Sequence, residues 1–478
     1  MVKCWVNGEW MEAESKQVTE IRNPATGEVV DMVPRCGAKE TQRAIDAAAA
    51  AFPAWSALSA EERGRILLKA AEVVKAKMKD LAPWLTKEQG KSIRDAELEI
   101  GHFLHGLEYY AGLVSRVRGD FVPLPGKHMH GVVMRRPLGV CGAIVPWNFP
   151  ITLMGNKIGP GLAAGNTFVV KPASTTPLCS IAVVEAMHEA GIPKGVLNIV
   201  TGPGGEVGEE LVQNPKVVRI GFTGETVTGR HVGEAAGRHF KRVSLELGGS
   251  DPCIVCDDAD LDKAAPAVAI GRFFNCGQAC LAVKRLYVFA GVYDAFVEKL
   301  VGRANRLKLG NGMEKETQMG PLHTAGQLKE VEEQVSDAVR RGAKVVAGGG
   351  RPEGPEFAKG YFYKPTILVD AAEDARVATE ETFGPVLPIW KVKDLEEALA
   401  KANNHVYGLG SSIWTRDMTK AAVAADRLEA GNVWVNSLHY GHDEMPFGGV
   451  KQSGIGREHG IEALLSYYET KGVVYTML

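Results

Sequence analysis

The sequence predicts an α/β protein with largely parallel sheets. Helix-like and strand-like segments alternate through most of its 478 residues, which is typical of sheets whose strands are joined by crossover helices. Short β-rich runs that end in turn residues follow one another between residues 138 and 248, and this succession indicates a doubly wound, nucleotide-binding sheet. A chain of this length exceeds a single compact core, so we expect two or three domains.

Composition and charge exclude several classes of protein. The formal net charge is -2 and charged residues make up 23% of the chain, so we expect no nucleic-acid partner and no membrane partner. The first ten residues, MVKCWVNGEW, lack the apolar core of a secretion signal. The eight cysteines are too sparse for a disulfide scaffold. We therefore expect free thiols in a reducing, cytoplasmic compartment.

The predicted elements follow in chain order. A long helix is expected over residues 59–80, where Ser59 and Glu62 form a capping-box pattern. A strand, a turn and a second strand follow within GVVMRRPLGVCGAIVPWNFP, residues 131–150. The runs GNTFVV, GVLNIV and VVRIGFT are further strands, and the last leads into a helix. A second β/α succession runs from SLELGG to about Gly449.

Two β-prone segments have no obvious partner nearby in the sequence. One lies near residues 118–137 and the other is the tail, LLSYYETKGVVYTML, residues 464–478. Unpaired strands favour pairing with another subunit. We therefore expect a homo-oligomer.

The cysteines leave three interpretations open: a metal loop, buried structural thiols, or a nucleophile. Cys253 and Cys256, with Cys276 and Cys280, superficially resemble zinc-ribbon spacing. However, PCIVCD is apolar and β-branched, and residues three apart on a strand face opposite sides, so we expect no metal. Cys280 lies in NCGQAC, where Gly277 and a small alanine let the backbone pass close to a ligand. This setting suits a reactive thiol.

Two polar residues lie in unusual apolar contexts. Asn148 is clamped in PWNFP, which is either a rigid aromatic turn or a fixed amide aimed at a developing oxyanion. Glu246 lies in LELGG, at the end of an apolar strand. A buried carboxylate is unfavourable unless it is paired or faces a cavity, so Glu246 is either an ordinary paired glutamate or a base with a raised pKa.

Nucleotide-binding features follow two predicted strands. Lys171, in KPAS, comes directly after NTFVV, and the carboxyl end of a parallel strand is where a nucleotide lies in such a sheet. Gly224, in FTGET, stands at a strand-to-helix turn whose N–H groups suit a pyrophosphate. No correctly spaced G-x-G-x-x-G is present; TGPGGEVG comes nearest.

These stretches together resemble a known family. PWNFP, KPAS, FTGET, LELGG, GQAC, ETFGPV and MPFGGVKQSGIGRE occur in the order of the signatures of the aldehyde dehydrogenase superfamily, and the likeness runs through essentially the whole chain. The resemblance implies that Cys280 is the nucleophile and that Asn148 and the Cys280 backbone N–H form the oxyanion hole. It makes Glu246 the general base. Members that pass the acyl group to coenzyme A lack this glutamate, so a free carboxylic acid is the expected product.

The resemblance also implies a nicotinamide cofactor, NADP or NAD. The implied cofactor-binding residues are Trp147, Lys171, Ser174, Gly224, Glu225, Glu381 and Phe383. Lys171 would bind the adenosine ribose and Glu381 the nicotinamide ribose, while Phe383 would pack against the nicotinamide ring. Ser174 stands where NAD-selective members often carry glutamate, so we expect NADP to be accepted. Glu225 stands where many members have serine.

The expected substrate is an aldehyde of small size and polar character. The residues that would line its tunnel are Phe149, Asn156, Phe274, Leu281 and Phe447. Succinic-semialdehyde-type members tend to have arginines where this chain has Asn156 and Phe274, so a lactaldehyde- or glyceraldehyde-like substrate is preferred over that alternative. The loop SLHYGHDEM, residues 437–445, either is a solvated loop or brings four polar side chains near the tunnel mouth, namely His439, Tyr440, His442 and Asp443.

The implied architecture has three parts. A Rossmann-like cofactor domain would comprise residues 1–117 and 138–248, and an α/β catalytic domain residues 249–449. A small β oligomerisation bridge would comprise residues 118–137 and 464–478, giving a homodimer or homotetramer. Outside this class, a cofactor-free cysteine hydrolase and a catalytically silent structural relative are the alternatives.

Overall fold

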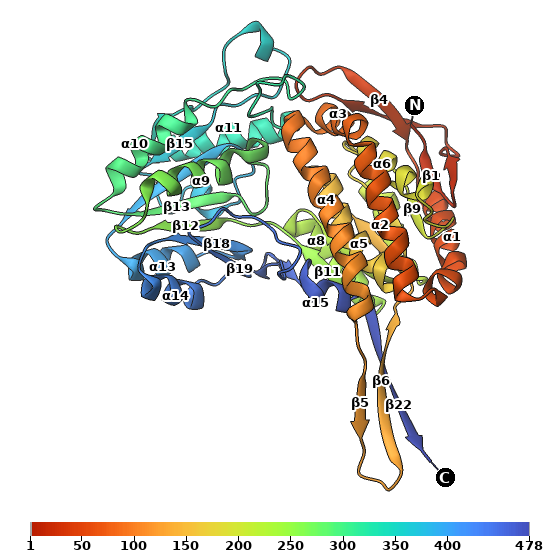
Figure 1. The fold of residues 1–478 in the computed structure, drawn as a ribbon. Helices are drawn as coiled ribbons and strands as arrows, with labels where there is room; N and C mark the ends of the chain where they lie inside the picture. Colours follow the sequence, from red (N-terminus) through yellow and green to blue (C-terminus); the bar gives the residue numbers. More distant parts are fainter. Residues whose placement is uncertain (1, 478) are drawn as a thin grey trace.

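The protein consists of two large sheets with their helices and a narrow β arm that projects away from them (Figure 1). The computed structural model describes residues 2–477. The first residue of the predicted cofactor domain and the last residue of the predicted oligomerisation segment therefore lie outside the described part. No helix within residues 2–477 combines the length and the apolar character needed to cross a bilayer.

The first sheet is doubly wound, as the sequence predicts. Five parallel strands occupy its centre in the order β9 (Leu197–Ile199), β8 (Thr167–Lys171), β7 (Val140–Ile144), β10 (Val217–Thr223) and β11 (Arg242–Glu246). The antiparallel strands at its edges are β1 (Cys4–Val6), β2 (Glu9–Met11) and β21 (Gly454–Ile455). The strand order reverses between β7 and β10, and ligands bind such sheets at the carboxyl ends beside this point.

Helices cover both faces of the first sheet. α5 (Pro150–Ala164) and α6 (Leu178–Glu189) pack beneath α2 (Ala60–Ala76), α3 (Met78–Gln89) and α4 (Ile93–Leu113) in one apolar cluster. α1 (Ala38–Ala57), α7 (Glu209–Gln213) and α8 (Thr226–Arg238) contribute to another. The capping box of Ser59 and Glu62 is confirmed. The single helix predicted over residues 59–80 is wrong beyond Ala76, because the chain turns at Lys77 and α3 packs along α4 and α6.

The second sheet has six parallel strands and one antiparallel edge strand. Its order is β14 (Lys344–Ala347), β15 (Thr366–Val369), β16 (Val386–Val392), β13 (Val283–Phe289), β12 (Asp251–Val255), β18 (Gly410–Trp414) and β19 (Asn432–Val435). Its helices are α9 (Leu261–Phe273), α10 (Tyr293–Ala304), α11 (Ala325–Arg340), α12 (Arg376–Thr379), α13 (Leu395–Asn403) and α14 (Met418–Arg427). Cys253 lies on β12 and Cys256 directly after it, both buried.

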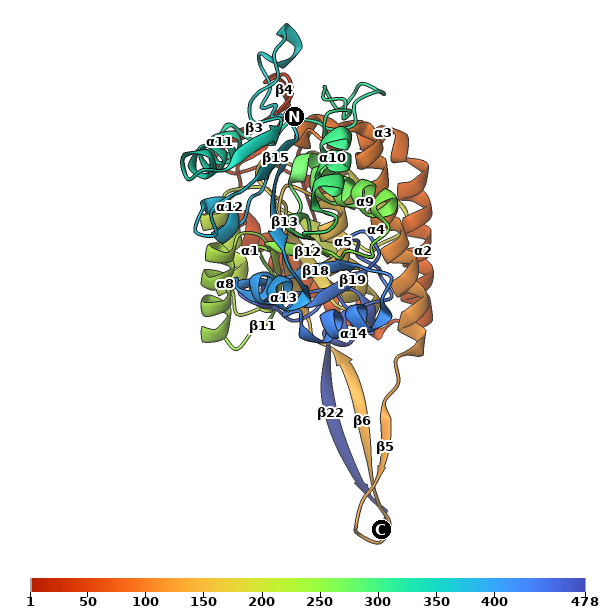
Figure 2. The same cartoon turned by 90° about the vertical axis from the view of Figure 1, so that its left-hand side faces the viewer.

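The arm unites the two segments that the sequence left without partners. β22 (Tyr468–Thr476) pairs antiparallel with β6 (Met129–Pro137), and β6 also pairs with β5 (Asp120–Pro123). Figures 1 and 2 show these three strands extending well beyond the two sheets. The tail strand begins four residues later than predicted, because α15 (Gly460–Leu465) takes up its first residues. The outer edges of β5 and β22 remain unpaired within residues 2–477.

The two sheets meet through opposite edges. β11 ends at Glu246, and the segment 247–250 leads directly into the amino end of β12. The carboxyl edge of the first sheet therefore faces the amino edge of the second. A short hairpin of β3 (Val18–Arg22) and β4 (Val29–Pro34) and a two-stranded pair, β17 (Tyr407–Gly408) with β20 (Val450–Lys451), complete the strands.

Candidate active site

Cys280 lies on a loop at the amino end of β13, where the two sheets meet. The short 3-10 helix before it has three consecutive residues in the left-handed region: Asn275 at φ 49°, Cys276 at φ 57° and Gly277 at φ 71°. A Cβ at Gly277 would lie 2.3 Å from the carbonyl oxygen of Gly384, so only glycine fits there. Cys276 packs into the apolar core of the second sheet, whereas Cys280 is half-buried. This tight coil separates the two thiols into different environments.

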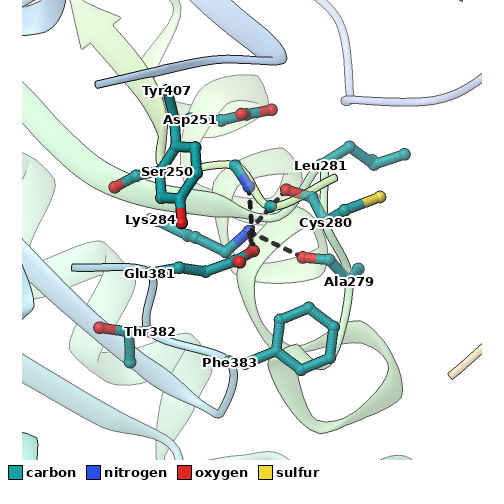
Figure 3. A network of polar contacts seen from close by, with 12 residues as sticks. Ser250, Asp251, Ala279, Cys280, Leu281, Lys284, Glu381, Thr382, Phe383 and Tyr407 are labelled. Atoms are coloured by element: carbon teal, nitrogen blue, oxygen red, sulfur yellow. Dashed lines mark hydrogen bonds and ion pairs between the residues drawn. The ribbon is translucent and has the colours of Figure 1, made fainter. Parts of the chain in front are cut away.

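A buried lysine holds the Cys280 loop in place. The ammonium of Lys284 donates to the carbonyl oxygens of Ala279 at 2.9 Å and Cys280 at 2.5 Å, and it contacts the Glu381 carboxylate at 3.0 Å (Figure 3). Glu381 also accepts a hydrogen bond from the Gly249 N–H at 3.1 Å. One side chain thus ties the thiol loop to the segment before β16. Sequence reasoning missed Lys284, although a lysine in the apolar strand VKRLYVF is a signal that could have found it.

Asn148 is fixed against the same loop. It follows β7 at the point where the strand order reverses, and its side-chain NH2 donates to the carbonyl oxygen of Gln278 at 3.1 Å. Its own carbonyl oxygen accepts from Asn275 Nδ2 at 3.0 Å and Lys91 Nζ at 2.7 Å. The structure therefore places Asn148 in contact with Gln278, which precedes Cys280 by two residues in the chain. Buried partners hold both its side chain and its backbone carbonyl in place.

Glu246 is buried at the carboxyl end of β11, and neither of its carboxylate oxygens has a hydrogen-bond partner among the described residues. Burial raises its pKa well above the usual value, and the charge of Glu458 adds to the rise, while Lys157 and Arg457 oppose it. Glu458 contacts Lys157 Nζ at 2.7 Å. A carboxyl group with a raised pKa and free oxygens is suited to accept a proton from a small molecule beside it.

The Cys280 thiol is protonated at neutral pH in this arrangement. Burial raises its pKa to about 12, the Lys284 ammonium opposes the rise, and the carboxylates of Glu381, Glu246 and Asp251 add to it. The charges of these three carboxylates therefore reach the thiol and hold its proton in place. The thiol has to lose its proton before it can act as a nucleophile.

Three of the expected cofactor residues lie where the sequence predicts, at the carboxyl ends of β8 and β10 or just beyond. Among the described residues, the Lys171 ammonium donates only to the carbonyl oxygen of Pro172, at 3.0 Å, and burial lowers its pKa to about 8. Ser174 donates to the carbonyl oxygen of Gly202 at 3.1 Å. The N–H of Gly224 donates to the carbonyl oxygen of Glu246 at 3.0 Å, which links this edge to the base candidate.

The remaining cofactor candidates are two aromatic residues in contact and an exposed glutamate. Trp147 stacks on His323 with ring centroids 4.5 Å apart and meets Phe383 edge-on at 5.6 Å. The side chain of Glu225 is exposed at the start of α8 and makes no capping hydrogen bond. These features fit a dinucleotide. Lys171, with N–H donors that the described residues leave unused, lies at the carboxyl edge of the first sheet, and the Glu381 carboxylate and the aromatic pair Trp147 and Phe383 lie towards the thiol loop.

The expected substrate residues form two contacting groups. Phe149 and Phe274 stack with centroids 5.5 Å apart. Asn156 and Phe447 both contact His459: Asn156 Nδ2 lies 3.1 Å from its Nε2, and the Phe447 ring meets it edge-on at 5.9 Å. The carbonyl oxygen of Leu281 lies 2.9 Å from His439 Nδ1, which joins the thiol loop to the segment 437–445.

The segment 437–445 is only partly solvated. His439 and Asp443 are buried, whereas Tyr440 and His442 are exposed. Asp443 contacts His105 Nδ1 at 2.6 Å and His459 Nδ1 at 2.7 Å. Two of its polar side chains are therefore structural parts of the site. Within residues 2–477, no three His, Cys, Asp or Glu side chains are arranged to hold a metal ion.

A doubly wound sheet beside a half-buried thiol, an adjacent buried amide and an unpaired carboxyl group defines an oxidoreductase of the nicotinamide-dependent, cysteine-containing class. Comparison with known proteins identifies the family: the model of the aldehyde dehydrogenase family matches residues 10–473. The chain belongs to the aldehyde dehydrogenase family and is an NAD(P)-dependent aldehyde dehydrogenase.

Individual relatives cover nearly the whole chain. Glutarate-semialdehyde dehydrogenase of Pseudomonas putida is 45% identical over 98% of this chain and 96% of its own length. Succinate-semialdehyde dehydrogenase [NADP(+)] of Escherichia coli is 42% identical over the same shares. Among solved structures, betaine aldehyde dehydrogenase of Staphylococcus aureus in complex with NAD+ is 35% identical with a TM-score of 0.96, covering 99% of this chain and 94% of that one. The Rossmann-like fold predicted from the sequence is confirmed.

Proposed function

We propose that this aldehyde dehydrogenase converts a small polar aldehyde to the free carboxylic acid through a thioester on Cys280. Glu246 is the observation that carries the proposal: within residues 2–477 its two buried carboxylate oxygens have no hydrogen-bond partner, and its carboxylate contributes to the raised pKa of the Cys280 thiol. A carboxyl group in that state is a base for water. A cofactor-free cysteine hydrolase would not need the residues at the carboxyl edge of the first sheet.

The proposed chemistry uses three side chains. The Cys280 thiol loses its proton to solvent, and the thiolate adds to the aldehyde carbon. The side-chain amide of Asn148 stabilises the resulting oxyanion together with the Cys280 backbone N–H. When bound, the oxidised nicotinamide supplies the hydride acceptor. Loss of hydride from the thiohemiacetal leaves a thioester on Cys280. Glu246 then takes a proton from water, the hydroxide adds to the thioester carbon, and the acid leaves as the Cys280 thiolate is released.

The cofactor is proposed to lie along the carboxyl edge of the first sheet. Lys171 and Ser174 would contact the adenosine ribose, Gly224 and Glu225 would flank the pyrophosphate, and Glu381 would hold the nicotinamide ribose, with Trp147 and Phe383 beside the ring. Because no carboxylate stands at Ser174, the 2′-phosphate of NADP is tolerated next to the Lys171 ammonium. The NADP(+) specificity in the name of the Escherichia coli relative supports this assignment.

The substrate is proposed to pass between the stacked pair Phe149 and Phe274 on one side and Asn156 and Phe447 on the other, towards Leu281. Asn156 already donates to Glu458 Oε2 at 3.1 Å and contacts His459. The nearby ammonium groups of Lys91 and Lys157 are already paired with Glu99 and Glu458, so neither is offered to a carboxylate tail. A hydroxylated aldehyde such as lactaldehyde or glyceraldehyde suits these polar groups. A dicarboxylic semialdehyde is the second candidate, since two relatives carry such names.

Kinetics with purified enzyme test the function and the substrate together. Lactaldehyde, glyceraldehyde, succinic semialdehyde and glutaric semialdehyde are offered with NAD and with NADP, and reduced cofactor is followed by absorbance. The hydroxylated aldehydes should show the higher kcat/KM. Higher values for both semialdehydes would replace the substrate proposal, and no reduction of either cofactor by any aldehyde would overturn the function.

The variant Glu246→Gln tests the base. A rapid first turnover of reduced cofactor should remain, while steady-state turnover falls about a hundredfold, because general-base catalysis contributes roughly 10²–10⁴. The exposed Glu234, paired with Arg238 on α8, supplies the matched control Glu234→Gln, which should behave as the parent enzyme. Unchanged steady-state turnover in Glu246→Gln would refute the assignment.

The arm supports a proposed homodimer or homotetramer. Within residues 2–477 the outer edges of β5 and β22 are unpaired, and these strands carry exposed apolar side chains, with Phe121 68% and Val474 62% exposed. Exposed edges of this kind favour strand pairing between copies. We also propose the domain division 1–117 with 138–248, 249–449, and 118–137 with 464–478. All eight cysteines are free thiols, which supports a reducing, cytoplasmic location.

A further inference from the structure

We propose that Asp443 and His459 are positioning residues for hydrolysis of the acyl-enzyme. They act through Asn156, which holds the Glu458 carboxylate beside Glu246. The inference rests on the proposed role of Glu246 as the base that activates water.

An unbroken series of side-chain contacts joins these residues. Asp443 Oδ1 lies 2.7 Å from His459 Nδ1, and His459 Nε2 lies 3.1 Å from Asn156 Nδ2. The same Asn156 nitrogen donates to Glu458 Oε2 at 3.1 Å. Asp443, His459 and Glu458 are buried and Asn156 is half-buried. Buried polar groups connected in this way orient one another rigidly.

The chemistry of the groups fixes the direction of each hydrogen bond. The Glu458 carboxylate accepts the Lys157 ammonium at Oε1, 2.7 Å away, so its Oε2 also acts as an acceptor. Asn156 must therefore turn its NH2 towards Glu458, and its second N–H points at His459 Nε2. That nitrogen has to accept, so the His459 proton sits on Nδ1 and is donated to Asp443.

Further contacts hold the outer end of the series. The second carboxylate oxygen of Asp443 lies 2.6 Å from His105 Nδ1 on α4, and its backbone carbonyl accepts from the Gly460 N–H at 2.8 Å. His459 has φ 56°, in the left-handed region that few side chains adopt. The ring of His459 is therefore set by both its backbone and its partners. Asn156 cannot rotate without losing the acceptor that this ring provides.

The far end of the series acts on the base. The Lys157 ammonium, which contacts Glu458 Oε1 at 2.7 Å, also donates to Thr223 Oγ1 at 2.6 Å. Thr223 pairs with Glu246 across β10 and β11. Glu458 at this position contributes to the raised pKa of Glu246, which makes Glu246 a better proton acceptor when it is ionised.

Release of Asn156 frees one carboxylate oxygen of Glu458, so the position of that charge relative to Glu246 is no longer fixed. Proton removal from water then slows. Addition of the Cys280 thiolate and loss of hydride do not use this base and keep their rates.

Two substitutions of His459 separate positioning from a general structural role. In His459→Asn, the short amide can still donate to Asp443, but it leaves Asn156 without an acceptor. In His459→Gln, the longer amide places an oxygen near the former Nε2. His239, an exposed histidine whose Nε2 lies 2.7 Å from Gln213 Oε1, gives the control His239→Asn.

Acyl-enzyme is measured directly by mass spectrometry of acid-quenched samples, alongside the burst of reduced cofactor. His459→Asn should keep the burst rate within twofold of the parent, hydrolyse the thioester about tenfold more slowly and accumulate acyl-enzyme. His459→Gln should hydrolyse within threefold of the parent rate, and His239→Asn should be unchanged. If His459→Asn does not fold, Asp443→Ala removes the acceptor of the His459 Nδ1 proton and should give the same tenfold loss of hydrolysis with an unchanged burst.

Three results would overturn the proposal: hydrolysis at the parent rate in His459→Asn, an equal slowing of burst and hydrolysis, or glutamine as slow as asparagine. Parallel measurement of Glu246→Gln distinguishes failure of the positioning role from failure of the proposed role of Glu246 as the base. Slow hydrolysis in Glu246→Gln with normal hydrolysis in His459→Asn would remove only the positioning role. Normal hydrolysis in both variants would remove the base assignment as well.

Discussion

Replacement of Lys284 by methionine should loosen the thiol loop and make the thiol less reactive. The Lys284 side chain is 1% exposed, and its ammonium serves two carbonyl oxygens and the Glu381 carboxylate. Methionine fills similar space but donates no hydrogen bond. The carbonyl oxygens of Ala279 and Cys280 would lose this donor, and Glu381 would keep only the Gly249 N–H among these contacts.

The magnitude follows from burial and charge. Removing one partner of a buried ion pair destabilises a protein by about 3–5 kcal/mol. Glu381 is 19% exposed, so water reaches part of its carboxylate, and we expect the lower end, about 3 kcal/mol. An opposite charge nearby lowers a pKa by about one unit or more. Without Lys284, the thiolate fraction of Cys280, and with it the rate of alkylation, should fall about tenfold at a given pH.

Urea unfolding and iodoacetamide alkylation measure these two effects. Alkylation reports on Cys280 because it is the one cysteine of the eight that is not fully buried. The exposed Lys299, whose ammonium lies 2.8 Å from Asp262, provides the control Lys299→Met, which should change neither value. If Lys284→Met lost less than about 1 kcal/mol and kept the parent alkylation rate, the assigned role of this ammonium would be wrong.

Three further predictions concern the cofactor, the pH dependence and the arm. Ser174→Glu should lower kcat/KM for NADP at least tenfold with little change for NAD, since like charges repel the 2′-phosphate; equal losses for both cofactors would contradict this. Burial lowers the pKa of His323 to about 4 from 6.5, so the unfolded chain binds a proton that the folded chain does not. Stability should therefore fall by about 3 kcal/mol as the pH drops from about 6.5 to about 4. In His323→Gln, chemical unfolding across this pH range should show a shallower slope; an unchanged slope would exclude His323 as the cause. The double variant Phe121→Lys with Val474→Lys should lower the mass measured by light scattering, and an unchanged mass would place the subunit contact elsewhere.

The residues of the first sheet could be predicted from the sequence because a general rule locates them. Lys171 is the last residue of β8 and Gly224 directly follows β10, and carboxyl ends beside the reversal of strand order bind nucleotides. Cys280 and Glu381 precede strands of the second sheet and lie at its amino edge. No rule of strand order points there. Cys280 was a candidate from its local sequence but gained its role, like Glu381, through the resemblance to a family.

Residues whose partners are distant in the chain could not be predicted from the sequence. Lys157 and Glu458 form a buried ion pair although 301 residues separate them. Lys157 alone reads as a lysine in an apolar helix, and nothing in the sequence supplies its partner. The arm shows the same limit: both β-prone segments were recognised, but their pairing with each other depends on how two distant parts of the chain come together.

The attachment of two loops to one ammonium has a consequence for how this protein tolerates change. Lys284 fastens both the loop that carries the sulfur and the segment that carries Glu381. Movement of either loop is thereby coupled to movement of the other through the Lys284 ammonium. Substitutions around position 381 should thus alter the reactivity of a cysteine that they do not touch, and selection acting on one loop constrains the other.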